Sequence, residues 1–115
     1  MKPAQRELTQ LSAREIAAGI RSKHFSAREV TEVTLKRIER INPQLNALVD
    51  CDRDGALIAA DAVDRRIAAG ESLPFAGVPI TIKDNLWVGG RRVAQGSRLF
   101  ENFIAPRDAW CVARL

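Results

Sequence analysis

The tetrapeptide Ser-Ala-Arg-Glu occurs twice near the start of this chain, as Ser12–Glu15 and as Ser26–Glu29. A serine followed three residues later by a glutamate is the capping-box spacing, in which each side chain hydrogen-bonds to a free backbone N–H at the start of a helix. Apolar residues at helical spacing follow each copy. The sequence therefore predicts a helix within residues 8–24 and a longer helix that begins after Ser26.

Further signals predict where the second helix ends and where a third one lies. We expect the second helix to end at Asn42–Pro43, because a proline pushes the residue before it out of the α-helical region. A short, partly alternating run over residues 45–51 then predicts a strand. A third helix is predicted from about Asp54 to Ala69, with Gly70 in the left-handed conformation that often follows a helix.

Residues 77–93 carry the pattern of β-structure. Val78, Ile80 and Ile82 alternate with other residues, which is the period of a short strand that ends at Lys83. Two glycines between β-prone runs predict a hairpin turn at Gly89–Gly90. Residues 94–100 are predicted to form a loop, and a last helix is predicted to begin over residues 108–115 with Asp108 as its cap.

This order of elements predicts the α/β fold class, with a mixed sheet core covered by helices. We interpret residues 1–115 as part of a single domain, with a helical lead-in over about 8–70, a lysine-bearing strand and hairpin over about 77–93 and the start of a further helix over 108–115. The strands are too few to cover the helices, and the last helix has no stop signal before Leu115. We therefore expect the N-terminal part of a truncated domain, which is largely molten in isolation.

Charge and cysteine content restrict the function. The net charge of +4 comes from 18 basic and 14 acidic residues that are mixed along the chain, so direct nucleic-acid binding is the weaker alternative to a solvated surface. No apolar run approaches the roughly 18 residues that cross a membrane. Cys51 and Cys111 fit no CxxC motif, so we expect no metal site, two buried cysteines and a reducing cytoplasm.

Three segments carry a family resemblance. They are Gly77–Asn85 (Gly-Val-Pro-Ile-Thr-Ile-Lys-Asp-Asn), Ala94–Ser97 (Ala-Gln-Gly-Ser) and Asp108–Leu115 (Asp-Ala-Trp-Cys-Val-Ala-Arg-Leu). With these segments and its helical opening, the sequence resembles the N-terminal part of the amidase signature family, which includes amidases and the A subunit of tRNA-dependent amidotransferases. The resemblance spans about residues 8–115 and implies the first strands and helices of the amidase signature fold.

The resemblance implies a catalytic triad of a nucleophilic serine, a bridging serine held by a cis peptide bond, and a lysine. The lysine of the family's Ile-Lys-Asp segment corresponds to Lys83. The family places both serines in a Gly- and Ser-rich motif well downstream, and no such motif occurs before Leu115. One catalytic residue of three is therefore carried over, and we expect these 115 residues alone to be inactive.

Lys83 also has a chemical argument of its own. A lysine that acts as a base near neutral pH must lose its proton, and burial between apolar neighbours such as Ile80 and Ile82 favours the neutral form. The alternative is a lysine at a strand end that extends into solvent. We expect Asp84 to hold the local backbone or to be an ordinary turn residue rather than to act directly in catalysis. Candidates for the pocket wall are Gln95, Gly96 and Ser97.

We therefore expect the full-length protein to be a cytoplasmic amidase that hydrolyses the C–N bond of a small, linear, non-peptide carboxylic amide without a cofactor. A related alternative is the A subunit of an amidotransferase, which passes ammonia to a partner that holds aminoacyl-tRNA. An alternative from another class is a non-catalytic helical interaction fragment. We expect no membrane contact and no direct contact with nucleic acid outside the amidotransferase case, and a homodimer is one possible assembly.

Overall fold

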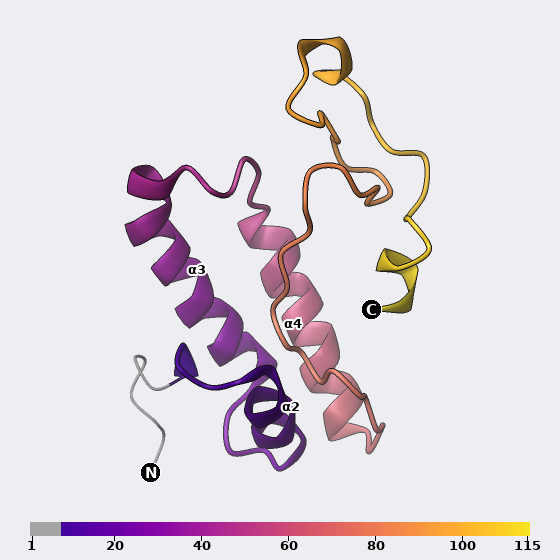
Figure 1. Cartoon of the computed structure of the whole chain (residues 1–115). Helices are drawn as coiled ribbons and strands as arrows, with labels where there is room; N and C mark the ends of the chain where they lie inside the picture. The colour runs from indigo at the N-terminus through magenta and orange to yellow at the C-terminus, as the bar shows by residue number, and fades with distance from the viewer. Residues whose placement is uncertain (1–7) are drawn as a thin grey trace. The chain divides into compact units, whose positions relative to one another are not determined.

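The computed structural model describes residues 8–115, which divide into two compact units (Figure 1). The helical unit, which ends at Pro79, contains α2 (Ala13–Arg21), α3 (Ala27–Leu45) and α4 (Arg53–Ala68). The C-terminal unit, residues 80–115, contains two short 3-10 helices, η1 (Arg98–Phe100) and η2 (Val112–Arg114). Among the helices described, none has the length and apolar character needed to cross a membrane.

Both predicted capping boxes are present, and they set the starts of α2 and α3. At the first, the Ser12 N–H donates to Glu15 Oε2 at 2.7 Å, and the Glu15 N–H donates to Ser12 Oγ at 3.3 Å. The corresponding distances between Ser26 and Glu29 are 2.9 and 3.0 Å. Hydrogen bonds from the hydroxyl and the backbone N–H of Ser12 lower the pKa of Glu15 below its ordinary value of 4.5, because they favour the ionised carboxylate.

The second helix extends further than predicted. α3 continues to Leu45 with Pro43 inside it, so the prediction that the helix ends at Asn42–Pro43 is wrong. A proline in the last turn removes only one backbone hydrogen bond, and the rest of the helix outweighs that loss. The helix ends at Asn46, which adopts a left-handed φ of 50° and donates its backbone N–H to Asn42 O at 2.6 Å.

The strand predicted over residues 45–51 does not form, and the side chain of Asn42 gives the reason. Its Oδ1 atom accepts hydrogen bonds from the backbone N–H groups of Ala47 and Leu48, both at 2.9 Å, and its Nδ2 atom donates to Leu48 O at 2.9 Å. These local bonds occupy backbone groups that a strand would need for pairing with a neighbour.

The third predicted helix is α4, which packs against both α2 and α3. Gly70 follows it in the predicted left-handed conformation, with a φ of 89°. The buried faces of the helices meet in one apolar core, where Ile20 and Val30 are only 1% and 2% exposed. The apolar stripes in the sequence therefore located this core, and Val78 of the segment predicted as a strand packs against it without forming a strand.

An acidic side chain of α4 fixes the start of α3. The Asp64 carboxylate accepts hydrogen bonds from the backbone N–H groups of Ala27 at 2.7 Å and Arg28 at 3.1 Å. N–H groups in the first turn of a helix have no partner within that helix, so Asp64 satisfies two of them. The Arg28 guanidinium also contacts the Asp61 carboxylate at 2.6 Å, and this hydrogen bond raises the pKa of Arg28 above its ordinary value.

The strand and hairpin predicted over residues 77–93 are also absent, and residues 8–115 contain no strand. A turn does form at Gly89–Gly90, closed by a bond of 2.9 Å from the Arg91 N–H to Val88 O. Its arms do not pair with each other, because residues 91–93 run antiparallel to residues 103–105 through an isolated bridge. A strand needs a paired neighbour, and no described segment pairs with residues 79–83. The sheet core of the α/β class therefore stays a prediction.

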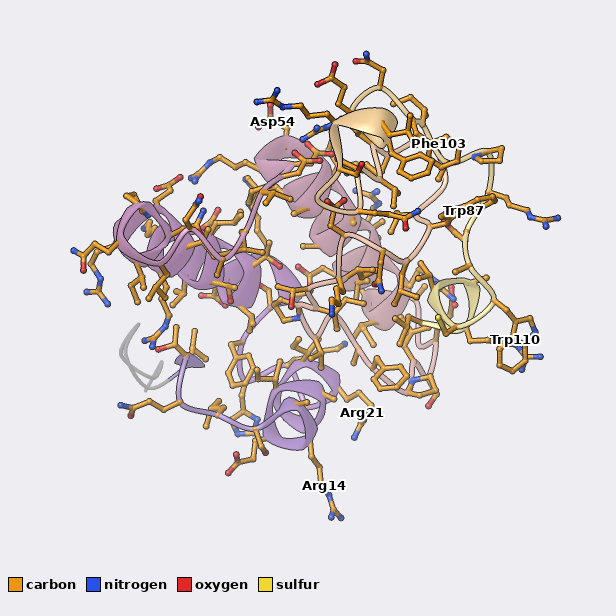
Figure 2. All side chains as sticks on the ribbon, turned by 45° about the horizontal axis from the view of Figure 1, so that its top comes forward. Arg14, Arg21, Asp54, Trp87, Phe103 and Trp110 are labelled. Carbon is orange, nitrogen blue, oxygen red and sulfur yellow. The ribbon has the colours of Figure 1, made fainter. Side chains whose placement is uncertain are left out.

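The helix predicted to begin at Asp108 is replaced by η2. The Asp108 carboxylate accepts a hydrogen bond from the Gly89 N–H at 2.7 Å, so it joins two distant segments of the C-terminal unit instead of capping a helix. The apolar interior of this unit is small. Val93 and Ala105 are buried, and the ring centroids of Trp87 and Phe103 lie 5.4 Å apart (Figure 2).

Candidate active site

Lys83 lies in the C-terminal unit at the start of a tight turn. The Leu86 N–H donates to Lys83 O at 3.0 Å and closes this turn. The Lys83 side chain is exposed, and its ammonium group makes no hydrogen bond or ion pair with any residue that the structure describes. Its apolar neighbours do not enclose it within these residues, since Ile80 is 52% exposed. Within this chain the lysine is hydrated, and its role as a base stays a prediction.

Asp84 connects the lysine segment to the loop that holds the other predicted site residues. Its side-chain Oδ1 atom accepts a hydrogen bond from the Ala94 N–H at 3.0 Å. Its backbone oxygen accepts another from the Gln95 N–H at 3.1 Å. Two bonds between segments ten residues apart fix the position of Lys83 relative to the loop. Asp84 therefore links the backbone of these two segments, and its role in a complete site stays a prediction.

The loop itself is a four-residue turn from Ala94 to Ser97. The Ser97 N–H donates to Ala94 O at 2.9 Å, and both central residues have a positive φ, 53° at Gln95 and 66° at Gly96. This is the φ signature of a type I′ turn. Glycine adopts such a φ freely, but glutamine does so at a cost of about 1–2 kcal/mol. The Ser97 Oγ atom accepts a hydrogen bond from the Leu99 N–H at 3.2 Å and so caps η1.

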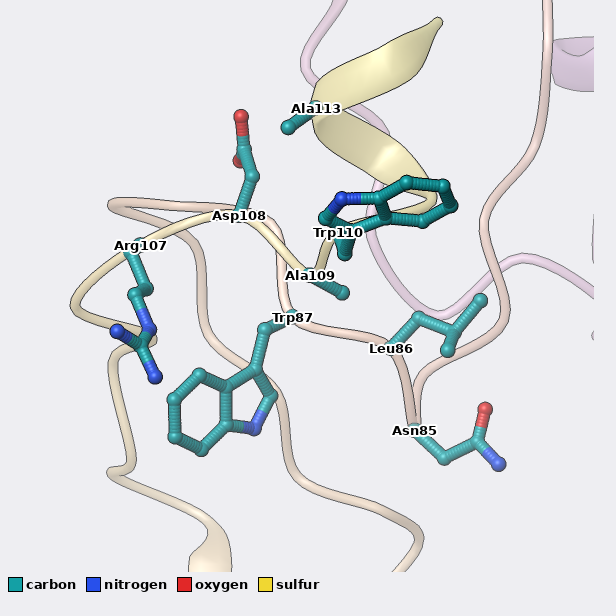
Figure 3. A pocket seen from close by; sticks show the side chains of 8 residues that line it. All are labelled: Asn85, Leu86, Trp87, Arg107, Asp108, Ala109, Trp110 and Ala113. Atoms are coloured by element: carbon teal, nitrogen blue, oxygen red, sulfur yellow. The ribbon is translucent and has the colours of Figure 1, made fainter.

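The C-terminal unit also contains a hollow of about 550 Å³, which we call the tryptophan depression (Figure 3). It is lined by Asn85, Leu86, Trp87, Arg107, Asp108, Ala109, Trp110 and Ala113. The two chain segments that line it, residues 85–87 and 107–113, are joined by the bond from the Gly89 N–H to the Asp108 carboxylate and by a bond of 2.8 Å from the Ala109 N–H to Trp87 O. None of the predicted site residues lines it, so the site and the depression are adjacent in sequence but distinct.

Sequence reasoning missed the depression and misplaced the cysteines. The available signal for the depression was the pair of tryptophans, Trp87 and Trp110. Trp110 is 74% exposed, with the Arg114 guanidinium 4.4 Å from its ring centroid. Cys51 and Cys111 were predicted to be buried, and both are exposed free thiols. No cluster of three or more His, Cys, Asp or Glu side chains suited to a metal ion occurs in residues 8–115.

A second hollow, of about 360 Å³, lies in the helical unit beside the single histidine. The His24 Nδ1 atom is 2.6 Å from Ser22 Oγ, at the end of α2. The acidic groups in its wall belong to the capping interactions already described, because Glu29 completes a capping box and Asp64 binds the start of α3. This hollow is therefore part of the helix-capping structure.

Comparison with known proteins places this arrangement in a family. The family model described as Amidase matches residues 29–115. The A subunit of the glutamyl-tRNA(Gln) amidotransferase from Alkalilimnicola ehrlichii is 50% identical over 101 residues, which are 88% of this chain and 21% of the relative. The protein of the same name from Carboxydothermus hydrogenoformans is 44% identical over 110 residues, which are 95% of this chain and 23% of the relative.

The backbone of this chain is also similar to part of a solved structure. It is described as an unexpected vestigial protein complex that reveals the evolutionary origins of an s-triazine catabolic enzyme. The match has a TM-score of 0.85 and 35% sequence identity, and it covers 90% of this chain but only 23% of that one. The chain thus spans about a fifth of the length of the curated relatives and about a quarter of the solved chain.

Proposed function

This chain belongs to the amidase family, and we propose on that premise that it is the lysine-bearing N-terminal portion of an enzyme that hydrolyses carboxylic amides. The observation that carries the proposal is the pair of hydrogen bonds that Asp84 accepts from the N–H groups of Ala94 and Gln95. These bonds hold Lys83 in a defined position next to the turn at residues 94–97, within the segment that matches the family.

In the proposed mechanism, a serine Oγ atom attacks the amide carbon while its proton passes through the bridging serine to the neutral Lys83 amine. The tetrahedral intermediate then breaks the C–N bond, and the proton returns to the departing ammonia or amine. Water hydrolyses the acyl-enzyme by the reverse proton path. The two serines have no counterpart among these residues, and the neutral lysine requires a drier environment than Lys83 has here. Further polypeptide would have to supply both.

A second candidate is favoured by the names of the relatives. Both curated relatives carry the name of the A subunit of a glutamyl-tRNA(Gln) amidotransferase. In that case the ammonia released from the amide is passed to a partner that holds aminoacyl-tRNA, and not lost to solvent. Hydrolysis of small linear amides without any partner favours the simple amidase. Hydrolysis that requires partner proteins favours the amidotransferase.

The test replaces the aligned segment of the Alkalilimnicola ehrlichii protein by these 115 residues and measures amide hydrolysis by the resulting chimera, with its partner proteins added if they are required. Lys83→Ala should reduce kcat by about 100- to 10,000-fold, the usual contribution of a general base. Lys36→Ala, which removes an exposed lysine of α3, is the matched control and should retain activity. A Lys83→Ala chimera with normal kcat would refute the proposal.

The role of Asp84 as a positioning residue has its own readout in the same chimera. Asp84→Ala removes the acceptor for the Ala94 N–H, whereas Asp84→Asn keeps an oxygen at that position. We expect kcat to fall in Asp84→Ala and to be largely restored in Asp84→Asn, with KM little changed in both. Equal loss in the two variants would mean that the charge of Asp84 matters directly. A chimera that folds but never hydrolyses an amide would favour the non-catalytic interaction fragment.

A further inference from the structure

The C-terminal unit exposes an unusual share of large apolar side chains. Of the eleven large apolar side chains that are exposed in residues 8–115, seven belong to these 36 residues. Only Val93 and Ala105 are buried apolar residues within the unit. A unit of fewer than about 40 residues rarely folds by itself without disulfides, metals or association. Cys111 is a free thiol, so no disulfide compensates for the small core.

The tryptophan depression is the most developed part of this exposed surface. Trp110 and Leu86 form one side of it, and Trp87 and Arg107 form the other (Figure 3). Trp110 is 74% exposed although tryptophan offers the largest apolar area of any side chain. Tryptophan and arginine are the residues most enriched among the energetically dominant positions of protein interfaces. The Arg107 guanidinium has no partner among the described residues, so it is available to a carboxylate or carbonyl group.

The comparisons identify what would cover this surface. The same backbone occurs in a solved chain about four times as long, with 77% of that chain outside the match. The curated relatives likewise have almost four fifths of their length outside the match. We infer that the tryptophan depression is the docking surface for the remaining part of an amidase-family chain, whose apolar side chains cover Trp110 and Leu86. The inference rests on family membership and exposed surface, and not on the catalytic role of Lys83.

The experiment compares the solvent access of Trp110 in the 115-residue chain and in the chimera described above. In both proteins Trp87→Phe is introduced, and any other tryptophan of the chimera is replaced by phenylalanine, so that the fluorescence comes from Trp110 alone. Acrylamide should quench this fluorescence strongly in the isolated chain and at least several-fold less in the chimera, with the emission shifted to shorter wavelength. Equal quenching in the two proteins would overturn the inference.

Substitutions then test whether the depression is the surface that is covered. Trp110→Ser in the chimera should lower its Tm by at least about 2 °C, the shift expected for a loss near 1 kcal/mol in a large domain. The matched control is Leu99→Ser, because Leu99 is 84% exposed in the same unit but does not line the depression. Equal shifts for the two variants would contradict docking at this site.

A second copy of the chain is the competing occupant. Sedimentation velocity of the isolated chain should show a monomer whose sedimentation coefficient is unaffected by Trp110→Ser. A dimer that Trp110→Ser dissociates would instead assign the depression to self-association and overturn the inference. The test of docking and the test of the proposed function have separate readouts. Lys83→Ala should reduce amide hydrolysis by the chimera and leave the quenching of Trp110 unchanged.

Discussion

The helical unit and the C-terminal unit are stabilised in different ways. In the helical unit, capped helices bury apolar stripes in a closed core, with Ile20 and Val30 at its centre. The C-terminal unit has one isolated bridge and two short 3-10 helices, and hydrogen bonds to the carboxylates of Asp84 and Asp108 join its segments. All five predicted site residues lie in this second unit. The predicted site residues thus lie in the unit with the smaller apolar core.

The largest expected effect tests whether the helical unit has its own cooperative core. Ile20→Ala should lower the free energy of unfolding by about 2–5 kcal/mol, because it leaves a cavity at a fully buried position. Urea unfolding followed by far-ultraviolet circular dichroism measures this. Ile58→Ala on α4 is the matched control, since Ile58 is 67% exposed.

The same measurement on Val93→Ala tests whether the two units unfold independently. Val93 is buried in the C-terminal unit, so its truncation should leave the unfolding transition of the helices unchanged. A loss comparable to that of Ile20→Ala would mean that the two units unfold together. A chain that shows no cooperative transition at all would instead support the expectation that it is largely molten in isolation.

The fold could be predicted from the sequence where the signals are local. The capping boxes at Ser12 and Ser26 and the third helix, α4, depend on residues a few positions apart, and each was confirmed. The predictions that failed concern pairing between distant segments. Alternation over residues 77–83 is compatible with a strand, but the neighbour that would pair with it is not specified locally. Asn42 likewise formed bonds that the alternation of residues 45–51 could not reveal.

For the candidate site, the sequence yields a list of residues but not their geometry. The resemblance selected Lys83 and the turn at residues 94–97, and the structure joins these segments through Asp84. The burial of Lys83 in a complete enzyme stays a prediction, because the apolar neighbours Ile80 and Ile82 bury a lysine only if another layer covers them. Such a covering layer is not formed by these 115 residues, so their sequence cannot specify it. For the same reason the exposure of Trp110 was missed.

The next expected effect concerns the end of the helical unit, where Gly77 has a φ of 75°. A Cβ atom at this position would overlap Ala27 Cβ at the start of α3. Gly77→Ala should therefore cost about 2–5 kcal/mol, the sum of a left-handed alanine and an overpacked contact. Gly70→Ala is the matched control, because its φ is 89° but a Cβ atom would have no neighbour within 4 Å. Equal losses for the two variants would show that the contact with Ala27 is relaxed at no cost.

A smaller effect is expected where α4 binds the start of α3. Asp64→Ala removes the acceptor for the N–H groups of Ala27 and Arg28 and should cost about 1–2 kcal/mol, as the loss of a helix cap does. The matched control, Asp61→Ala, removes only a half-exposed ion pair with Arg28 and should cost less than about 1 kcal/mol. Thermal unfolding of both variants measures the difference. If Asp61→Ala is the more damaging, the ion pair and not the cap positions α4.

The smallest expected effect is the dependence of the helical unit on pH. The hydrogen bonds from Ser12 hold the folded-state pKa of Glu15 below its ordinary value of 4.5. A carboxylate with a depressed pKa in the folded state stabilises that state above its unfolded pKa, and this contribution is lost as the pH falls through the folded value. Glu15→Gln keeps a capping side chain at this position but does not titrate, so the free energy of unfolding of this variant should decline less steeply below pH 4.5 than that of the native chain.

Urea titrations at a series of acidic pH values measure the slopes. The matched control is Glu101→Gln, which lies in the C-terminal unit and should leave the slope for the helices unchanged. If Glu101→Gln flattens the slope as much as Glu15→Gln does, the acid sensitivity belongs to the whole chain, and the distinction between a self-sufficient helical unit and a dependent C-terminal unit fails.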